Sequence, residues 1–150
     1  MKSRNEMESD LQQAEWKQRS LGGFIQSAGP LWTRKEGNRW QYGILTDASH
    51  ANPAGLVHGG LLATLIDHTL SAAAWEAMDR RACVTVQLTT QFLVPVVPGA
   101  FLRASGEVVR STRSLVFMQG TLSVDNEVVL TGSAVLKVLA ASQSTTHGVE

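Results

Sequence analysis

Residues 52–78 read NPAGLVHGGLLATLIDHTLSAAAWEAM and join a loop of turn-forming residues to a long helical pattern. From Gly60 to Met78 there is no proline and no further glycine after the start. Apolar side chains cover most of this predicted helix, so we expect it to be buried on nearly all sides. Its polar side chains recur at spacings of three and four, which predicts one narrow polar stripe of Thr64, Asp67, His68 and Ser71.

The segments around this helix favour strands. Two strands are predicted near residues 29–35 and 39–46, separated by the turn signal Glu36-Gly37-Asn38. After residue 81 the period changes to two, with Val84, Val86, Leu88 and Phe92 alternating with polar residues. Three more strands are predicted over 101–109, 115–124 and 128–139, and the last two are joined by a hairpin at residues 125–126.

Strands that follow one another through tight turns form an antiparallel sheet, and the apolar helix must pack on its concave face. The predicted fold class is therefore α+β, with an antiparallel sheet wrapped around one long central helix. Residues 5–19 are predicted to form an extra, polar N-terminal helix that ends at Gly22-Gly23. We expect an N-terminal helical extension over residues 1–21, one domain over 22–139 and a disordered tail over 140–150.

Composition narrows the class of protein. The 150 residues include 13 basic and 13 acidic side chains, so no charge excess favours nucleic acid or an anionic membrane surface as a partner. The single cysteine excludes an intrachain disulfide and fits a reducing compartment. We find neither a secretory signal nor an apolar run of about 20 residues, the length that spans a bilayer. These features predict a soluble, cytoplasmic protein.

The bare start of the central helix and the carboxylate inside it are candidate functional groups. A helix N-terminus offers unpaired N–H groups with partial positive charge, and Gly59 and Gly60 let a carbonyl oxygen approach them closely. Asp67 lies among leucines, where a carboxylate needs a partner or a function. Structural alternatives stay open at this point. The glycines suit a tight helix entry, and Asp67 suits a buried carboxylate bonded to Thr64 or Ser71.

The same residues carry a family resemblance. A strand pair, a loop with Asn-Pro-x-Gly, His-Gly-Gly at a helix start, an Asp nine residues after the His and a long antiparallel meander resemble the hotdog-fold acyl-CoA thioesterases. Within them the chain is similar to the branch of the phenylacetate-pathway thioesterases, the mitochondrial type of mammalian thioesterase superfamily member and the Arthrobacter-type 4-hydroxybenzoyl-CoA thioesterases. The resemblance covers residues 22–139 and implies hydrolysis of an acyl-CoA to a free acid and coenzyme A.

The resemblance also implies residue roles. Asp67 matches the acidic residue that acts as general base or nucleophile, and the Gly59 N–H matches the group that polarises the thioester carbonyl. Asn52 and His58 match loop residues that shape the site and orient the leaving group or the carbonyl. Thr85 lies where some members have a Ser or Thr that helps to hold the attacking water.

The spacing of Gly59 and Asp67 predicts a composite site. Eight residues of helix separate them by about 12 Å, yet one thioester carbon must lie about 3 Å from both groups in the reactive complex. Two antiparallel helices of a two-fold dimer can satisfy this requirement. We therefore expect Asn52, His58 and Gly59 from one subunit and Asp67 and Thr85 from its partner. The family also forms such dimers, often paired into tetramers.

Coenzyme A carries phosphates, which guanidinium and hydroxyl groups bind well. We predict substrate contacts at the turn of residues 110–114, chiefly Thr112, Arg113 and Ser114, with Arg80 and Arg81 as an alternative. Gly60 and His68 are also assigned to substrate binding. His68 beside Asp67 suggests a metal site, but a third ligand at suitable spacing is missing, so we expect no metal and no cofactor besides the substrate's own coenzyme A.

Two other functions remain possible on these residues. One is a non-catalytic hotdog domain that binds acyl-CoA, which would have no need for a carboxylate at position 67. The other is a hotdog hydratase or dehydratase, which needs a second acid/base group that the sequence does not supply. The acyl group cannot be read from the sequence, because the depth of the pocket depends on side chains from two subunits.

Overall fold

The computed structural model describes residues 1–140 of the chain. Seven strands in this range form one antiparallel sheet, accompanied by α-helices and a short 3-10 helix. The elements in chain order are α1 Arg4–Gln13, β1 Lys17–Arg19, α2 Phe24–Ala28, β2 Leu31–Glu36, β3 Arg39–Leu45, η1 Ala48–His50, α3 Gly59–Ala77, β4 Cys83–Phe92, β5 Phe101–Ser111, β6 Leu115–Val124 and β7 Glu127–Val138.

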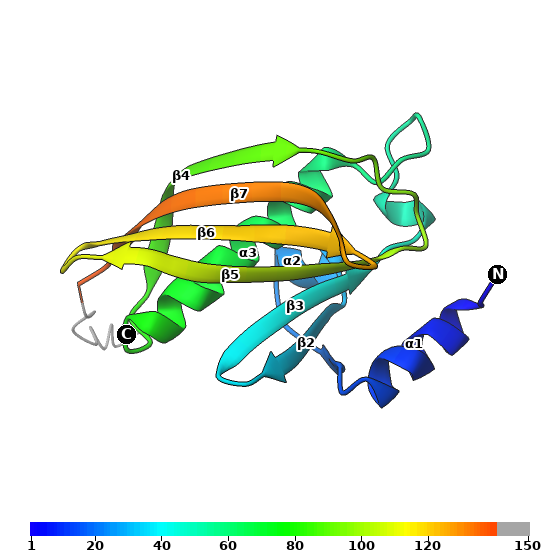
Figure 1. The fold of residues 1–150 in the computed structure, drawn as a ribbon, viewed down its shortest axis with the longest axis horizontal. Coiled ribbons are helices and arrows are strands. Elements are labelled where there is room, and N and C mark those ends of the chain that lie inside the picture. Colours follow the sequence, from blue (N-terminus) through cyan, green and yellow to red (C-terminus); the bar gives the residue numbers. More distant parts are fainter. Residues whose placement is uncertain (141–150) are drawn as a thin grey trace, which may run out of the picture.

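The sheet has the strand order β1-β2-β3-β5-β6-β7-β4 and wraps around helix α3. Figure 1 shows α3 running behind the curved sheet, with β4 at one edge and the β2–β3 hairpin near the other. The predicted α+β fold class and the sheet around one long helix are confirmed. The predicted helix of residues 60–78 and the four strands after it match the observed elements within a few residues.

A row of three glycines brings the sheet close to α3. Gly106, Gly120 and Gly132 are direct neighbours across β5, β6 and β7. A Cβ on Gly120 would lie 2.4 Å from the backbone oxygen of Ser105 and 2.9 Å from Leu70 of α3. No side chain fits in that space, so glycine is required where the helix approaches the strands.

Helix α3 is buried on one face rather than on nearly all sides. Its side chains toward the sheet form most of the core on the helix side, namely Leu61, Leu62, Leu65, Ile66, Thr69, Leu70 and Ala74. The opposite face carries small or polar side chains that are only half-buried, including Ala63, Thr64, Ser71 and Ala72. This face thus combines small side chains with a few polar ones and is not covered by the sheet.

The N-terminal extension is helical over a shorter range than predicted. Helix α1 ends at Gln13, and Glu15 has a φ of 69°, which no α-helix accommodates. Trp16 then packs edge-on against Phe101 at 4.9 Å, with the Arg34 guanidinium 4.8 Å above its ring. Burial of this indole pulls residues 17–19 onto β2 as strand β1, so the predicted helix of residues 5–19 is wrong in its second half.

A β-bulge changes the alternation of β4. The pairing of β4 with β7 shifts register between Thr85 and Gln87. Val84 and Val86, two of the apolar residues in the predicted alternation, are 43% and 63% exposed, while Thr85 reaches α3. A bulge re-aims the side chains around it, and sequence alternation alone does not reveal it.

The remaining expectations concern the ends of the chain. The hairpin at Asp125 and Asn126 is confirmed, and both residues have the positive φ that such a two-residue turn requires. The predicted disordered tail falls almost wholly on residues 141–150, outside the described range. None of the helices described in residues 1–140 has the length and apolar character that a membrane crossing demands. The predicted domain boundaries and cytoplasmic location stay predictions.

Candidate active site

The start of α3 leaves one backbone donor free. His58 is the N-cap, and its Nδ1 accepts a 2.8 Å hydrogen bond from the N–H of Gly60. The N–H of Gly59 has no partner within residues 1–140. Because Nδ1 accepts, the neutral imidazole carries its proton on Nε2. The helix therefore begins with a free N–H and an imidazole donor side by side.

Asn52 locks the loop that leads to this helix start. Its side-chain oxygen accepts hydrogen bonds from the N–H groups of Ala54 at 3.0 Å and Leu56 at 3.1 Å. The backbone of Asn52 is also bonded to Leu56, at 2.7 Å. This arrangement is an Asx turn, in which an asparagine side chain bonds the backbone that follows it. The two amide protons of Asn52 have no acceptor within the described residues, so they are available to a ligand.

Asp67 lies on the half-buried face of α3 and is held from the edge strand. The hydroxyl of Thr85 donates a 2.7 Å hydrogen bond to Oδ1 of Asp67. The hydroxyl of Ser71, one helical turn further on, lies 3.4 Å from that of Thr85. No described residue bonds the second carboxylate oxygen. One edge of the carboxylate is therefore fixed and the other faces outward.

The predicted polar stripe divides into two sides. His68 faces β3, where its ring packs edge-on against Tyr42 at 5.5 Å. Burial lowers the pKa of His68, and the nearby charge of Asp67 raises it by a smaller amount. Thr64 turns back along the helix and donates to the backbone oxygen of Gly60 at 2.8 Å. His68 therefore lies beside Tyr42 rather than beside Thr85, and its assignment to substrate binding stays a prediction.

Two hollows flank the start of α3. One of about 260 Å³ is bounded by Asn52 and Gly59 and is otherwise apolar, with Phe92 and the chain that follows it. The other, of about 360 Å³, is bounded by His58, Gly60 and Thr64 on one side. Its remaining wall comes from Leu61 of α3, from α2, and from η1 with its C-cap, namely Phe24, Ser27, Ala28, Ser49, His50 and Ala51. Gly59 thus borders the first hollow, and its neighbours His58 and Gly60 border the second.

The β5–β6 turn lies at the opposite end of the molecule. Figure 1 shows this hairpin near the C-terminal end of α3, away from the helix start. Thr112 closes the turn, since its N–H donates to the oxygen of Leu115 at 2.8 Å and its hydroxyl accepts from the N–H of Leu115 at 3.1 Å. Arg113 and Ser114 are exposed. Within one chain these residues are far from Gly59, and their contact with substrate stays a prediction.

The family model of the Thioesterase superfamily matches residues 54–131, just over half of the chain. The chain belongs to the thioesterase superfamily. The matched range runs from the loop before α3 into β7 and so includes every residue predicted to be catalytic except Asn52. The fold and the family expected from the resemblance are confirmed.

Two relatives show how similar this thioesterase-superfamily chain is to individual members in sequence. It is 31% identical to human acyl-coenzyme A thioesterase 13 over 102 residues, 67% of this chain and 66% of that protein. A Caenorhabditis elegans protein named as an esterase is 31% identical over 74 residues, 49% of this chain and 44% of that protein. The chain thus spans less than two thirds of the length of the curated relatives it matches.

A solved structure shows the same fold. A Bacillus halodurans protein, crystallised with CoA, superposes with a TM-score of 0.74 at 23% identity. The superposition covers 91% of this chain and 89% of that protein. At this identity the likeness concerns the fold.

Sequence reasoning missed two residues beside the predicted site. His50, in η1, is buried and bonded on both ring nitrogens. Phe92, at the end of β4, lies so close to Gly59 that a Cβ there would be 3.3 Å from its ring. A His two residues before Asn52 in a turn-rich loop was the only available signal for the first. The second follows only from the path of β4.

Proposed function

We propose that the protein is an acyl-CoA thioesterase in which Asp67 activates water or attacks directly, and Gly59 polarises the thioester carbonyl. The observation that carries this proposal is the pairing of a fixed carboxylate with a free backbone donor on a single helix. Asp67 is oriented by Thr85 through a 2.7 Å hydrogen bond. A structural carboxylate of the kind considered from the sequence would have its oxygens satisfied by Thr64 or Ser71, whereas here one oxygen has no partner in the described residues.

The chemistry follows from these groups. The thioester oxygen accepts a hydrogen bond from the Gly59 N–H, which stabilises the negative charge that develops there. Water attacks the carbonyl carbon while Asp67 removes a proton, or the carboxylate itself attacks and water then hydrolyses the anhydride. The carbon–sulfur bond breaks, and coenzyme A leaves as a thiolate that then takes up a proton. His58 Nε2–H is suited to donate a hydrogen bond to the leaving sulfur or the carbonyl.

The site is completed by a second copy of the chain. Gly59 and Asp67 lie eight residues apart on α3, about 12 Å along one helix, which is too far for one substrate carbon. Two features support the pairing of two subunits. The outer edge of β4 is open, and its Val84 and Val86 are exposed. The face of α3 that points away from the sheet is only half-buried and carries small side chains. An unpaired apolar edge strand is a template for another strand. In the dimer each Gly59 serves the partner's carboxylate.

The substrate class is supported from outside the chain. The Bacillus halodurans protein with the same fold was crystallised with CoA, and the human relative is named as an acyl-coenzyme A thioesterase. In an antiparallel dimer the β5–β6 turn of one subunit comes near the helix start of the other, because the two lie at opposite ends of one chain. Arg113, Thr112 and Ser114 are then placed to contact the phosphates of coenzyme A.

The experiment that tests this function uses Asp67→Asn in the full chain with a panel of aromatic, medium-chain and branched acyl-CoA thioesters. Asparagine keeps an acceptor for the Thr85 hydroxyl but cannot remove a proton. We expect kcat to fall by about 10²- to 10⁴-fold, the range of general base catalysis, with CoA binding retained in calorimetry. Glu76→Gln is the matched control, because it removes an exposed carboxylate from the same helix.

The outcomes separate the candidate functions. Hydrolysis that survives Asp67→Asn would remove Asp67 from the mechanism. Acyl-CoA binding by the wild-type chain without hydrolysis of any thioester in the panel would indicate a binding domain instead. Hydration of an enoyl-CoA by the wild-type chain would indicate a hydratase.

A further inference from the structure

A buried histidine outside the proposed mechanism has both ring nitrogens engaged. His50 is 8% exposed. Its Nδ1 accepts a hydrogen bond of 3.0 Å from the N–H of Asp47, and its Nε2 lies 2.7 Å from the oxygen of Ala28. The oxygen can only accept and the N–H can only donate, so both bonds are met by the neutral ring with its proton on Nε2. The ring thus ties η1 to the end of α2.

The backbone of His50 extends this tie to the active site. Its carbonyl oxygen accepts a 2.8 Å hydrogen bond from the N–H of His58, the N-cap of α3. The next residue, Ala51, forms an isolated antiparallel bridge with Val57. The loop that contains Asn52 is therefore closed at its base by residues 50–51 and 57–58. Movement of η1 would move the helix start directly.

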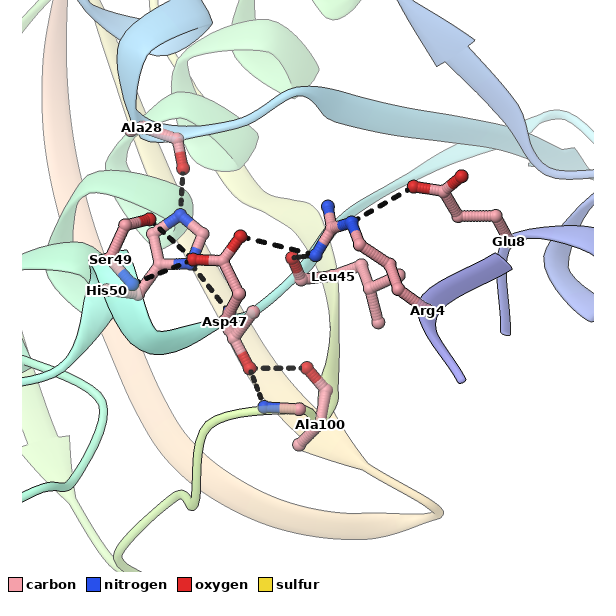
Figure 2. A network of polar contacts seen from close by, with 10 residues as sticks. Arg4, Glu8, Ala28, Leu45, Asp47, Ser49, His50 and Ala100 are labelled. Carbon is pink, nitrogen blue, oxygen red and sulfur yellow. Dashed lines mark hydrogen bonds and ion pairs between the residues drawn. The ribbon is translucent and has the colours of Figure 1, made fainter. Parts of the chain in front are cut away.

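Figure 2 shows the polar network that joins η1 to the N-terminal helix α1. Asp47 caps the 3-10 helix by accepting hydrogen bonds from the N–H and the hydroxyl of Ser49. These bonds, the hydroxyl's first, lower the pKa of Asp47. The guanidinium of Arg4 lies 3.3 Å from the other oxygen of Asp47 and 3.1 Å from Glu8. The N-terminal helix is thereby joined to the segment that carries His50.

We propose that His50 is a positioning residue for thioester hydrolysis: its buried imidazole fixes η1, and through it the place of His58 and the Gly59 N–H relative to the substrate. The proposal rests on the proposed function, since it concerns the donor that polarises the thioester. Catalysis requires such donors to be held within a fraction of an ångström, and small displacements reduce turnover strongly. The side chain of His50 bonds Asp47 and Ala28 rather than Gly59, so it acts on the donor through η1.

The test compares His50→Leu with His50→Gln in the full chain. Leucine fills the space and loses both side-chain hydrogen bonds, whereas glutamine keeps a donor near the place of Nε2. We expect His50→Leu to lower kcat by about 10- to 100-fold with KM within about threefold of wild type, because the helix start is displaced while most binding contacts remain. His50→Gln is expected to recover part of kcat.

Thr46→Val is the matched control. Thr46 is buried beside Asp47, and its hydroxyl donates to the oxygen of Ala100 at 2.6 Å and accepts from the N–H of Gly99 at 3.2 Å. The variant therefore loses as many buried hydrogen bonds as His50→Leu, but from the loop before β5. We expect a comparable fall in melting temperature with kcat unchanged. Equal kcat in His50→Leu and Thr46→Val would overturn the positioning role.

Hydrogen exchange separates this proposal from the proposed function. In His50→Leu the backbone amides of residues 51–62 should exchange faster than in wild type, whereas in Thr46→Val faster exchange should appear in residues 97–100. If the wild-type chain hydrolyses no thioester, the proposed function fails and exchange alone decides whether His50 holds the helix start. Unchanged exchange of residues 51–62 in His50→Leu would contradict the proposal in either case.

Discussion

The hydroxyl of Thr85 donates a 2.7 Å hydrogen bond to Oδ1 of Asp67 and thereby joins the edge strand β4 to the central helix α3. The bulge after Thr85 is part of the same arrangement, since it lets the strand turn this side chain toward the helix. The bond leaves Oδ2 as the free oxygen of the carboxylate. A base with one oxygen held and one free has a defined direction of attack, which is what water activation requires.

Thr85→Val keeps the shape of the side chain and removes this hydrogen bond. A hydrogen bond to a charged group contributes about 1.5–3 kcal/mol, so we expect kcat to fall by about 10- to 100-fold. Thr85→Ser, which keeps a hydroxyl, should retain most of the activity. Thr89→Val on the exposed side of the same strand serves as the control. Steady-state kinetics on one acyl-CoA decides the matter, and full activity in Thr85→Val would show that Asp67 needs no such orientation.

Gly59→Pro removes the candidate oxyanion donor with little disturbance of the helix. Gly59 is the first helical residue, where proline is well tolerated because its missing N–H has no helical partner. His58 has φ −61° and ψ 132°, a conformation that residues before proline favour. We expect kcat to fall by about 10²- to 10³-fold, the usual cost of losing one oxyanion donor.

Gly59→Ala isolates the steric part of that change. Its Cβ would lie 3.3 Å from the Phe92 ring, a contact that Gly59→Pro also makes, but the N–H remains. Kinetics of the two variants side by side separate the donor from the crowding. Equal losses in both would mean that crowding against Phe92, rather than the N–H, explains the effect.

Most of the fold could be predicted from the sequence because it depends on local periodicity. The change from a period near 3.6 to a period of two located α3 and the strands that follow it, and the Asp125-Asn126 pair located the last hairpin. Asp67 and Gly59 could be placed on one helix from the same pattern. The half-buried outer face of α3 was not foreseen, since periodicity does not indicate whether an apolar face is covered within the same chain.

The features that sequence reasoning missed depend on contacts between distant segments. His50 bonds a backbone oxygen 22 residues away, and nothing near it in the sequence marks that partner. Trp16 ends the N-terminal helix early because it packs against Phe101, which belongs to a strand at the middle of the sheet. The exposure of Val86 follows from a bulge in the pairing of β4 with β7, two strands that are far apart in the sequence. Tertiary packing overrides local pattern at each of these places.

Gly120→Ala tests the close approach of helix and sheet. The new Cβ would lie 2.4 Å from the oxygen of Ser105, a backbone atom that cannot move without disrupting β5. Overpacking of this kind costs about 1–3 kcal/mol. The free energy of unfolding measured in urea should therefore fall by at least about 1 kcal/mol. Gly22→Ala is the control, because nothing lies within 4 Å of a Cβ there. Protein concentration must match between samples, since the proposed dimerisation would contribute to the stability of both variants. A Gly120→Ala midpoint equal to that of the control would refute this explanation of the glycine row.

The composite site can be tested by mixing two inactive variants. Asp67→Asn lacks the carboxylate and Gly59→Pro lacks the donor, so each homodimer has two defective sites. In a mixed dimer of the predicted type, one site combines the intact Gly59 of the first chain with the intact Asp67 of the second. Random exchange of subunits in equal amounts should therefore restore about a quarter of wild-type activity.

The control for this mixture is Asp67→Asn combined with Thr85→Val. Because Asp67 and Thr85 belong to one chain and bond each other, their mixed dimer contains one site without the carboxylate and one without its hydroxyl partner. That mixture should show no more activity than the two homodimers together. Sedimentation at decreasing protein concentration shows where the dimer dissociates, and activity assays over the same concentrations should show that activity is lost there. Mass spectrometry of tagged chains shows whether the subunits have exchanged. If they have and neither mixture recovers activity, each chain carries a whole site. The argument from the distance of about 12 Å between Gly59 and Asp67 along one helix would then fail.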